Sequence, residues 1–245
     1  SRSSAASDVY KRQIYNWTYL DEQDAKENYN TKELEENPYE VLPKLNLFTY
    51  EMSDIIMDKL DDGINLDGEM VEYAFDLNEF FSTDKRGAFV YDKDVDKFLD
   101  ALTDENRTKF PFSTPELRDE IKHSFWILNR VDSARALKRK LEVNPVFRDY
   151  DIVLAAGDGK TDDEVITEES LDRVRTAIEK YEKTITLSVG QLTTGVTVPE
   201  WTAVLMLANM KSPSLYMQAA FRAQNPFLFS DGNNYLSCLL YTSDA

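Results

Sequence analysis

The sequence is poor in the residues from which many proteins build metal and redox sites. Its 245 residues include one cysteine, Cys238, and one histidine, His123. A disulfide framework needs paired cysteines, and a zinc site of the usual kind needs several cysteine or histidine ligands. We therefore expect no disulfide and no bound metal cluster. The near-absence of cysteine also fits a cytoplasmic protein, which is the location we expect.

Long apolar runs and positive charge are also scarce. No stretch approaches the roughly 20 apolar residues that span a bilayer, so we expect no membrane partner. The 28 lysines and arginines stand against 45 aspartates and glutamates, which gives a formal charge of −17. Because contacts to phosphates require basic side chains, this balance argues against a surface that coats nucleic acid. A local basic groove stays compatible with it.

Both ends of the chain are predicted to be foreign to the natural protein. Tyr10 to Gln13 can be encoded by TATAAGAGACAG, and the reverse complement of that string runs from the end of a serine codon through Cys238 to Tyr241. Two unrelated termini would not share a mirrored coding string by chance. Both ends resemble translated sequencing-adapter DNA, which we assign to residues 1–13 and 238–245. Such segments are excluded from reasoning about the fold.

The remaining chain divides by composition into two parts. Residues 14–122 are rich in acidic and aromatic residues and are expected to be mostly helical and irregular, with helical spacing over 52–60 and again over 94–102. Residues 123–237 instead alternate between short apolar runs and amphipathic segments. The apolar runs, which predict strands, are 123–128, 151–156, 184–188 and 202–207. The amphipathic segments, which predict helices, are 132–141, 168–183 and 214–222.

Strands that alternate with helices predict an α/β domain with a parallel sheet and helices on both of its faces. The loops at the carboxyl ends of such strands are where ligands gather. One of these loops resembles a phosphate-binding loop, because Gly157–Thr161 ends in Gly-Lys-Thr. However, Leu154 stands where the full pattern needs its first glycine, and Asp158 would repel phosphate. We interpret this segment as a glycine-rich surface turn.

The most informative stretch runs from Val189 to Pro199, directly after the third predicted strand. It resembles motif V of superfamily 2 helicases, and most of all the motor subunits of restriction enzymes, in which the motif reads roughly V-D-x-L-x-T-G-x-D-x-P. The two acids of that pattern are replaced by Gly190 and Thr197. The positions that match are Val189, Leu192, Thr194, Gly195 and Pro199.

A second match follows on the last predicted helix. Gln218 and Arg222 fit motif VI of the same motors, which reads roughly Q-x-x-x-R-x-x-R, whereas Asn225 replaces the second arginine. Upstream, Phe125–Ala134 lies where the motif IV strand and helix would begin the lobe. The resemblance covers 123–229 and implies a truncated RecA-like lobe over 123–237. Residues 14–122 would then be an insertion or an inter-lobe segment.

The resemblance also implies roles for individual residues. Arg222 would act as an arginine finger on the γ-phosphate of ATP, and Gln218 lies one helical turn before it on the same face. ATP and Mg²⁺ would be held mainly by a first lobe, whose phosphate-binding loop and acidic motif this sequence lacks. The residues implied to contact nucleotide are Gly195, Thr197 and Arg222. Those implied to contact nucleic acid are Thr193, Thr194 and Gly195.

We therefore expect a fragment of an ATP-dependent DNA helicase or translocase that is inactive without the first lobe of its own chain. The sequence does not distinguish DNA from RNA as the nucleic acid along which the protein would move. The alternative is a non-enzymatic acidic α/β domain that binds other proteins and matches the motifs by coincidence. Arg222 would then be a surface arginine at a helix end. The basic run from Arg135 to Lys140 has two interpretations of its own, a solvated helix face or a surface that tracks phosphates.

Overall fold

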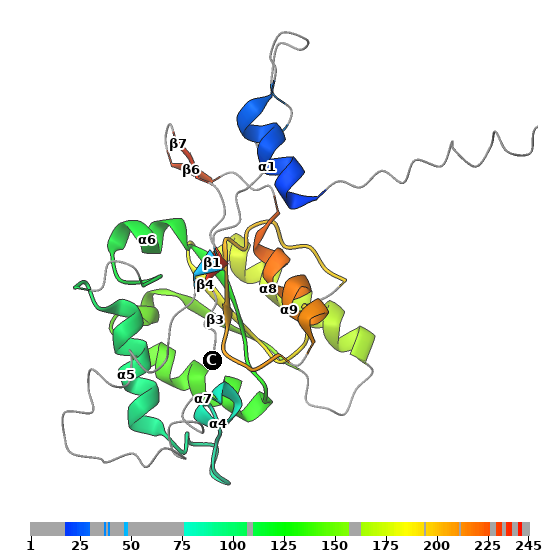
Figure 1. Cartoon of the computed structure of the whole chain (residues 1–245). Coiled ribbons are helices and arrows are strands. Elements are labelled where there is room, and N and C mark those ends of the chain that lie inside the picture. Colours follow the sequence, from blue (N-terminus) through cyan, green and yellow to red (C-terminus); the bar gives the residue numbers. More distant parts are fainter. Residues whose placement is uncertain are drawn as a thin grey trace, which may run out of the picture. The chain divides into compact units, whose positions relative to one another are not determined.

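A computed structural model describes residues 18–29, 37, 39, 47–48, 76–106, 110–156, 163–193, 195–210, 212–225, 229–231, 234–236 and 240–241. The chain forms two units, 1–42 and 43–245. The first unit contains helix α1 (Tyr19–Asn28), drawn in blue in Figure 1. The helix begins with a capping box. The Thr18 side chain accepts a hydrogen bond from the Asp21 N–H, and the Asp21 carboxylate accepts one from the Thr18 N–H. These bonds satisfy two donors that the helix itself cannot pair.

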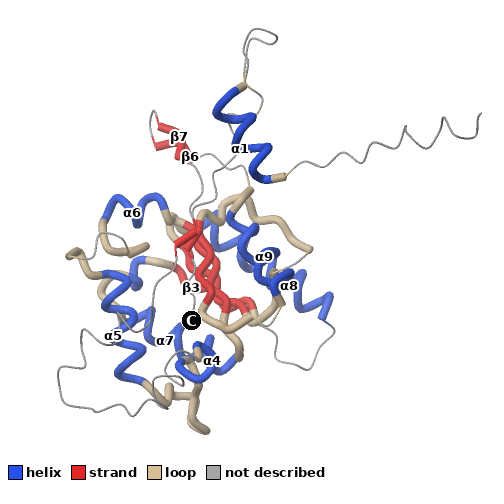
Figure 2. Tube along the Cα trace, viewed as in Figure 1, coloured by secondary structure: helices blue, strands red, loops and turns tan. Residues whose placement is uncertain are grey.

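The second unit is built around a sheet of four parallel strands, drawn in red in Figure 2. They are β2 (His123–Ile127), β3 (Asp151–Ala155), β4 (Thr184–Ser188) and β5 (Ala203–Met206). The strand order is β3-β4-β2-β5, so the first strand in the sequence is an inner strand of the sheet. Every neighbouring pair is parallel and in register, with Phe125 of β2 between Thr186 of β4 and Val204 of β5. The four strands predicted from the apolar runs are confirmed, and so is their parallel pairing.

Helices connect these strands. Helix α7 (Val131–Val143) and the short 3₁₀ helix η2 (Phe147–Asp149) join β2 to β3, and helix α8 (Asp163–Lys180) joins β3 to β4. Helix α9 (Pro213–Ala220) follows β5 and continues as the 3₁₀ turn η3 (Phe221–Ala223). The predicted α/β fold, with a RecA-like parallel sheet, is confirmed by this arrangement.

Alternate side chains of each strand enter two separate cores. Trp126 of β2 packs with Leu137 of α7 on one face, whereas Phe125 packs with Val174 of α8 and Ala219 of α9 on the other. Neighbouring side chains of a strand point to opposite faces, so a continuous apolar run is what a sheet covered on both sides requires. Figure 1 shows α7 on one side of the strands, and α8 with α9 on the other.

Part of the acidic region packs into the core on the α7 side. It contributes helices α4 (Leu77–Phe80), α5 (Asp92–Thr103) and α6 (Pro115–Glu120). Val95, Phe98 and Leu99 of α5 lie in the same core cluster as Leu137. The helix predicted over 94–102 is therefore confirmed as part of α5. The division of the chain at residue 122 stays a prediction.

The basic run on α7 has a use that neither interpretation of the sequence foresaw. Lys140 forms ion pairs with Asp92 and Asp96 of α5, with its ammonium nitrogen 2.9 Å and 2.6 Å from their carboxylate oxygens. Arg139 donates a hydrogen bond to the Gly87 carbonyl. Arg135 by contrast pairs with Asp132 at the surface, and its side chain is 51% exposed. Arg139 and Lys140 therefore join the acidic region to α7, whereas Arg135 belongs to a solvated face.

Two further pairs of short strands and one isolated bridge, between Thr83 and Phe89, lie in the described chain. Strands β1 (Leu47–Phe48) and β8 (Leu240–Tyr241) pair in parallel, and β6 (Phe229–Asp231) forms an antiparallel hairpin with β7 (Asn234–Leu236). Because β8 falls within 238–245, the adapter origin of that tail stays a prediction. The Gly-Lys-Thr segment at 157–161 and the helical spacing over 52–60 lie outside the described residues. Within the described chain, no helix has both the length and the apolar character needed to cross a membrane.

Candidate functional site

The loop that follows β4 carries the motif V residues at the carboxyl edge of the sheet. Three of its residues have left-handed backbone angles, with φ of +77° at Gly190, +60° at Leu192 and +74° at Gly195. Glycine adopts this conformation freely, whereas a residue with a side chain loses roughly 1–2 kcal/mol. The Leu192 side chain is 2% exposed and lies in the core beside α8. Burial of a leucine stabilises by about 1.5–3 kcal/mol, enough to offset the strain.

Hydrogen bonds fold the first half of this loop onto itself. The Thr193 hydroxyl donates to the Gly190 carbonyl oxygen at 2.7 Å, and the Ser188 hydroxyl donates to the Gln191 carbonyl. Thr193 is only 6% exposed. Its hydroxyl therefore turns into the loop and away from any nucleic acid that could pass outside. Thr194, the next residue of the implied contact, lies outside the described part of the chain.

The second half of the loop faces outward before the chain returns to the core. Gly195 and Thr197 are exposed, and a side chain built on Gly195 would meet nothing within 4 Å. The backbone at Gly195 is thus open to a ligand. Val198 and Trp201 are then fully buried, and the Trp201 ring stacks on Phe125 with 4.3 Å between the ring centroids. This stacking fixes the far end of the loop against β2.

The motif VI helix is set by its own capping residue. The Ser212 side chain accepts a hydrogen bond from the Leu215 N–H, and Pro213 occupies the first turn of α9, where its missing N–H costs nothing. Ala219 and Ala220 are buried against the sheet, whereas Gln218 is exposed. The small alanines let the helix approach the sheet closely and direct the polar positions outward.

Arg222 joins the two motifs. Its Nη1 donates to the backbone carbonyl of Val196 in the motif V loop, and its Nε donates to the Gln218 carbonyl at 3.3 Å. Partial burial lowers the pKa of Arg222, but a guanidinium keeps its charge at any physiological pH. The structure therefore brings Arg222 and Gln218 together with the outward half of the loop, which holds Gly195 and Thr197.

Sequence reasoning missed two features of this site. Asn225, which replaces the second motif VI arginine, donates its side-chain amide to the Arg222 carbonyl at 3.0 Å and so closes the turn that holds the arginine. Ser170 of α8 donates to the Gln191 side-chain oxygen at 3.1 Å. The departure from the motif marked Asn225 as unusual, but nothing in the sequence linked Ser170 to a loop 21 residues away.

The chemistry of the site fits an anionic group better than a metal ion. Arg222 supplies a fixed positive charge, and Gly195 supplies an open backbone, which together suit a phosphate. Within the described residues there is no group of three or more His, Cys, Asp and Glu side chains that could hold a metal ion.

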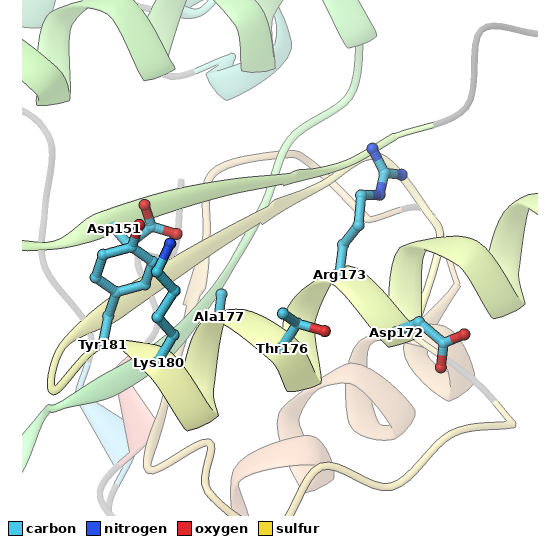
Figure 3. A pocket seen from close by; sticks show the side chains of 7 residues that line it. All are labelled: Asp151, Asp172, Arg173, Thr176, Ala177, Lys180 and Tyr181. Carbon is cyan, nitrogen blue, oxygen red and sulfur yellow. The ribbon is translucent and has the colours of Figure 1, made fainter.

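A separate pocket of about 350 Å³ lies along α8 (Figure 3). Asp151, Lys180 and Tyr181 gather at one end of it, where the Lys180 ammonium lies 5.0 Å from the Tyr181 ring centroid. Asp151 is the first residue of β3, so this end lies at the amino edge of the sheet, opposite to the motif loops. The full lining is Asp151, Asp172, Arg173, Thr176, Ala177, Lys180 and Tyr181. Its mixed charges favour neither an anion nor a cation.

Comparison with known proteins places this chain beside part of a restriction-modification protein. No protein-family model matches the sequence. A putative type II restriction enzyme and methyltransferase, the RM.MpnORF110P C-terminus of Mycoplasma pneumoniae, is 27% identical over 255 residues, which cover 94% of this chain and 34% of that protein. The chain thus spans about a third of the length of the curated relative it matches.

A looser likeness exists to a solved structure, the C-terminal part of the Fun30 ATPase domain. The TM-score is 0.40 with 14% sequence identity, over 82% of this chain and 85% of the other. A likeness at this level has no bearing on function. The functional argument therefore depends on the site itself and on the curated relative.

Proposed function

We propose that this chain supplies the second motor lobe of an ATP-dependent DNA helicase or translocase of the restriction-system type. The observation that carries the proposal is the hydrogen bond from the Arg222 guanidinium to the Val196 carbonyl. It unites residues 26 positions apart, one in each motif, at the edge of a parallel sheet where ligands of such folds bind. The Mycoplasma relative, described as a putative type II restriction enzyme and methyltransferase, supports the same class of system.

The way in which Arg222 is held suits a group that stabilises a transition state. Two of its five N–H donors are used by neutral carbonyl oxygens, which orient the guanidinium without cancelling its charge. Among the described residues no carboxylate forms an ion pair with Arg222, although the chain carries 45 acidic residues. The remaining donors are therefore available to the γ-phosphate when a first lobe closes on this one. Fixed charge of this kind needs no rearrangement during the reaction.

The outward half of the motif V loop is proposed to contact the nucleic-acid track. Backbone N–H groups and hydroxyls position a phosphate backbone without reading its sequence, as a translocating motor requires. Of the residues assigned to nucleic acid, Gly195 is described and exposed, whereas Thr197 stays assigned to nucleotide. The proposal assigns ATP and Mg²⁺ mainly to a first lobe outside these 245 residues. Bound Mg²⁺ would neutralise charge on the phosphates there, and this lobe would add the cation of Arg222.

The decisive experiment uses the gene together with its upstream sequence. We expect ATP turnover stimulated by DNA, and we expect Arg222→Ala to lower kcat at least about 100-fold, a conservative share of the effect of an arginine finger. DNA affinity should change little, since the lost interaction belongs to the transition state. Arg148→Ala is the matched control, because that side chain is 65% exposed. DNA and RNA are compared as stimulants.

Two outcomes would contradict the proposal. Near-normal turnover of the Arg222→Ala protein would reduce Arg222 to a surface arginine at the end of α9. Absence of any turnover stimulated by nucleic acid in the unaltered protein would favour the acidic interaction domain. The next experiment would then be to identify a protein that binds this face of the sheet.

A further inference from the structure

A buried serine on α8 connects a cation to the motif V loop. The Ser170 hydroxyl donates to the Gln191 side-chain oxygen at 3.1 Å and accepts from the Arg173 Nη2 at 2.9 Å. Ser170 is 0% exposed. Both the donor and an acceptor site of one hydroxyl are therefore used, and one of its partners carries a full charge. Hydrogen bonds to charged groups are roughly twice as strong as neutral ones.

Arg173 is itself held in place for this contact. Its Nε donates to the Glu169 carbonyl, one turn earlier in α8, at 3.3 Å. Figure 3 shows Arg173 and Asp172 leaving the helix in different directions, so the neighbouring carboxylate does not compete for the guanidinium. The serine is thus polarised by a cation that lies outside the loop and belongs to a stable helix.

The loop needs such a restraint. Leu192 holds a left-handed backbone, which persists in a non-glycine residue only where its surroundings over-determine it. The residue on either side is fixed by a side-chain bond, Gln191 by Ser170 and Thr193 by the Gly190 carbonyl. Of these bonds, the one from Ser170 comes from a different element of the fold. It therefore ties the loop to α8, in addition to the bond from Ser188 at the end of β4, whereas the Thr193 bond sets only the loop's internal shape.

We propose that Ser170, polarised by Arg173, positions the motif V loop so that the Val196 carbonyl can hold Arg222. Val196 lies five residues beyond Gln191, and it is the acceptor that orients the guanidinium. Ser170 is a positioning residue, because it acts through Gln191 and meets no reacting atom. The consequence for ATP turnover rests on the function proposed above, but the positioning of the loop does not depend on it.

Amide hydrogen exchange of the chain tests the proposal without ATP or DNA. In Ser170→Ala, exchange in the segment 189–198 should rise roughly tenfold, because loss of one such hydrogen bond changes a local opening equilibrium by about that factor. Exchange in α7 should not change. The Arg222 Nε–H resonance should also shift and exchange faster with solvent, as its orientation loosens. Thr176→Ala deletes an exposed hydroxyl two turns along α8 and should alter neither signal.

A second pair of variants tests the hydrogen bond between Ser170 and Gln191 by changing Gln191 instead of Ser170. Gln191→Leu keeps the shape of the side chain and removes the acceptor, so it should reproduce the effect of Ser170→Ala. Gln191→Glu keeps an acceptor beside Ser170 and should retain slow exchange. If Ser170→Ala fails to fold, Gln191→Leu decides the question. A loop whose exchange stays unchanged, or rises in step with that of α7, would overturn the proposal. If the exchange results agree with the proposal but the complete protein shows no ATP turnover, the positioning role of Ser170 stands and only the proposed motor function is wrong.

Discussion

Two threonines on one face of β4 differ in a single hydrogen bond. The Thr184 hydroxyl lies 3.0 Å from the Nδ1 of His123, whereas the Thr186 hydroxyl, two residues later, is buried with no hydrogen-bond partner among the described residues. Both threonines are 0% exposed. A buried hydroxyl without a partner costs about 1–3 kcal/mol, but one that is paired contributes to stability.

The two positions should therefore respond in opposite ways to the same substitution. Thr186→Val, which replaces the hydroxyl with a methyl group, is expected to raise the free energy of unfolding by roughly 1 kcal/mol. Thr184→Val should lower it by a similar amount, because the hydrogen bond between Thr184 and His123 is lost. Urea unfolding of both variants against the parent chain measures the difference. Destabilisation by Thr186→Val would mean that its hydroxyl has a partner after all.

The residues of the site show where sequence reasoning reaches its limit. Motif matching found Arg222 and Gly195, since both depend on residue type and order. The same resemblance assigned the Thr193 hydroxyl to nucleic acid. In the structure that hydroxyl is buried and donates to the Gly190 carbonyl, beside the left-handed backbone of Leu192. A leucine gives no signal of such a backbone, whereas a glycine does.

At the scale of elements, the ion pairs between α5 and α7 have a measurable effect. The Lys140 side chain is 16% exposed and pairs with two carboxylates, Asp92 and Asp96. Burial works to lower the pKa of Lys140, but the hydrogen bonds to these aspartates outweigh it and raise the pKa. A pair of charges shielded from water in this way is worth more than an exposed one, whose median contribution is about 0–1 kcal/mol.

We expect Lys140→Met to lower the free energy of unfolding by roughly 1 kcal/mol or somewhat more, and Arg135→Met by less than about 0.5 kcal/mol. Arg135 is the matched control, since it lies on the same helix in an exposed pair with Asp132. Because shielded pairs are screened less than exposed ones, the cost of Lys140→Met should persist in part at high salt. Equal effects of the two variants would show that α5 and α7 are joined by their apolar contacts alone.

Elements were predictable to different degrees for a physical reason. The strands and helices α7 to α9 could be predicted from hydrophobic periodicity. A strand buried on both faces has a continuous apolar run, and a helix buried along one side has apolar residues at helical spacing. The apolar side of α5 was predicted from its sequence in the same way. The element against which α5 packs could not be predicted, because hydrophobic contact is not directional and does not specify a partner. The ion pairs of the basic run could not be predicted for the same reason, because Asp96 lies 44 residues before its partner Lys140.

For the whole molecule, the distribution of charge matters more than its sum. A formal charge of −17 disfavours a nucleic-acid partner when it is considered as an average. The structure uses several of its cations in ion pairs with this acidic excess, and Lys122, Lys140 and Lys183 are examples. Arg222 is oriented by carbonyl oxygens instead. A site for an anion can therefore persist in an acidic chain, provided that its cation is shielded from the chain's own carboxylates.

The stability of the whole chain should depend on pH through its single histidine. His123 is 6% exposed, and burial lowers its pKa to about 4, helped by the charge of Lys122 and opposed by that of Glu182. The unfolded chain takes up this proton near pH 6.5, before the folded chain does. The contribution of the neutral histidine is thus fully present above about pH 6.5, and it is lost as the pH falls toward 4.

A shift of this size corresponds to roughly 3 kcal/mol of unfolding free energy between the two pH values. We expect the parent chain to lose about that much more stability than His123→Gln when the pH is lowered from 7 to 4, since glutamine does not titrate. The comparison with the variant is needed because carboxylates also lose stabilisation in acid. The Lys183 hydrogen bond to Asp119, for example, lowers the pKa of that carboxyl group in both proteins. Urea unfolding at intervals of half a pH unit gives the two curves. Parallel curves would mean that His123 becomes protonated without leaving its place, and that water reaches the start of β2.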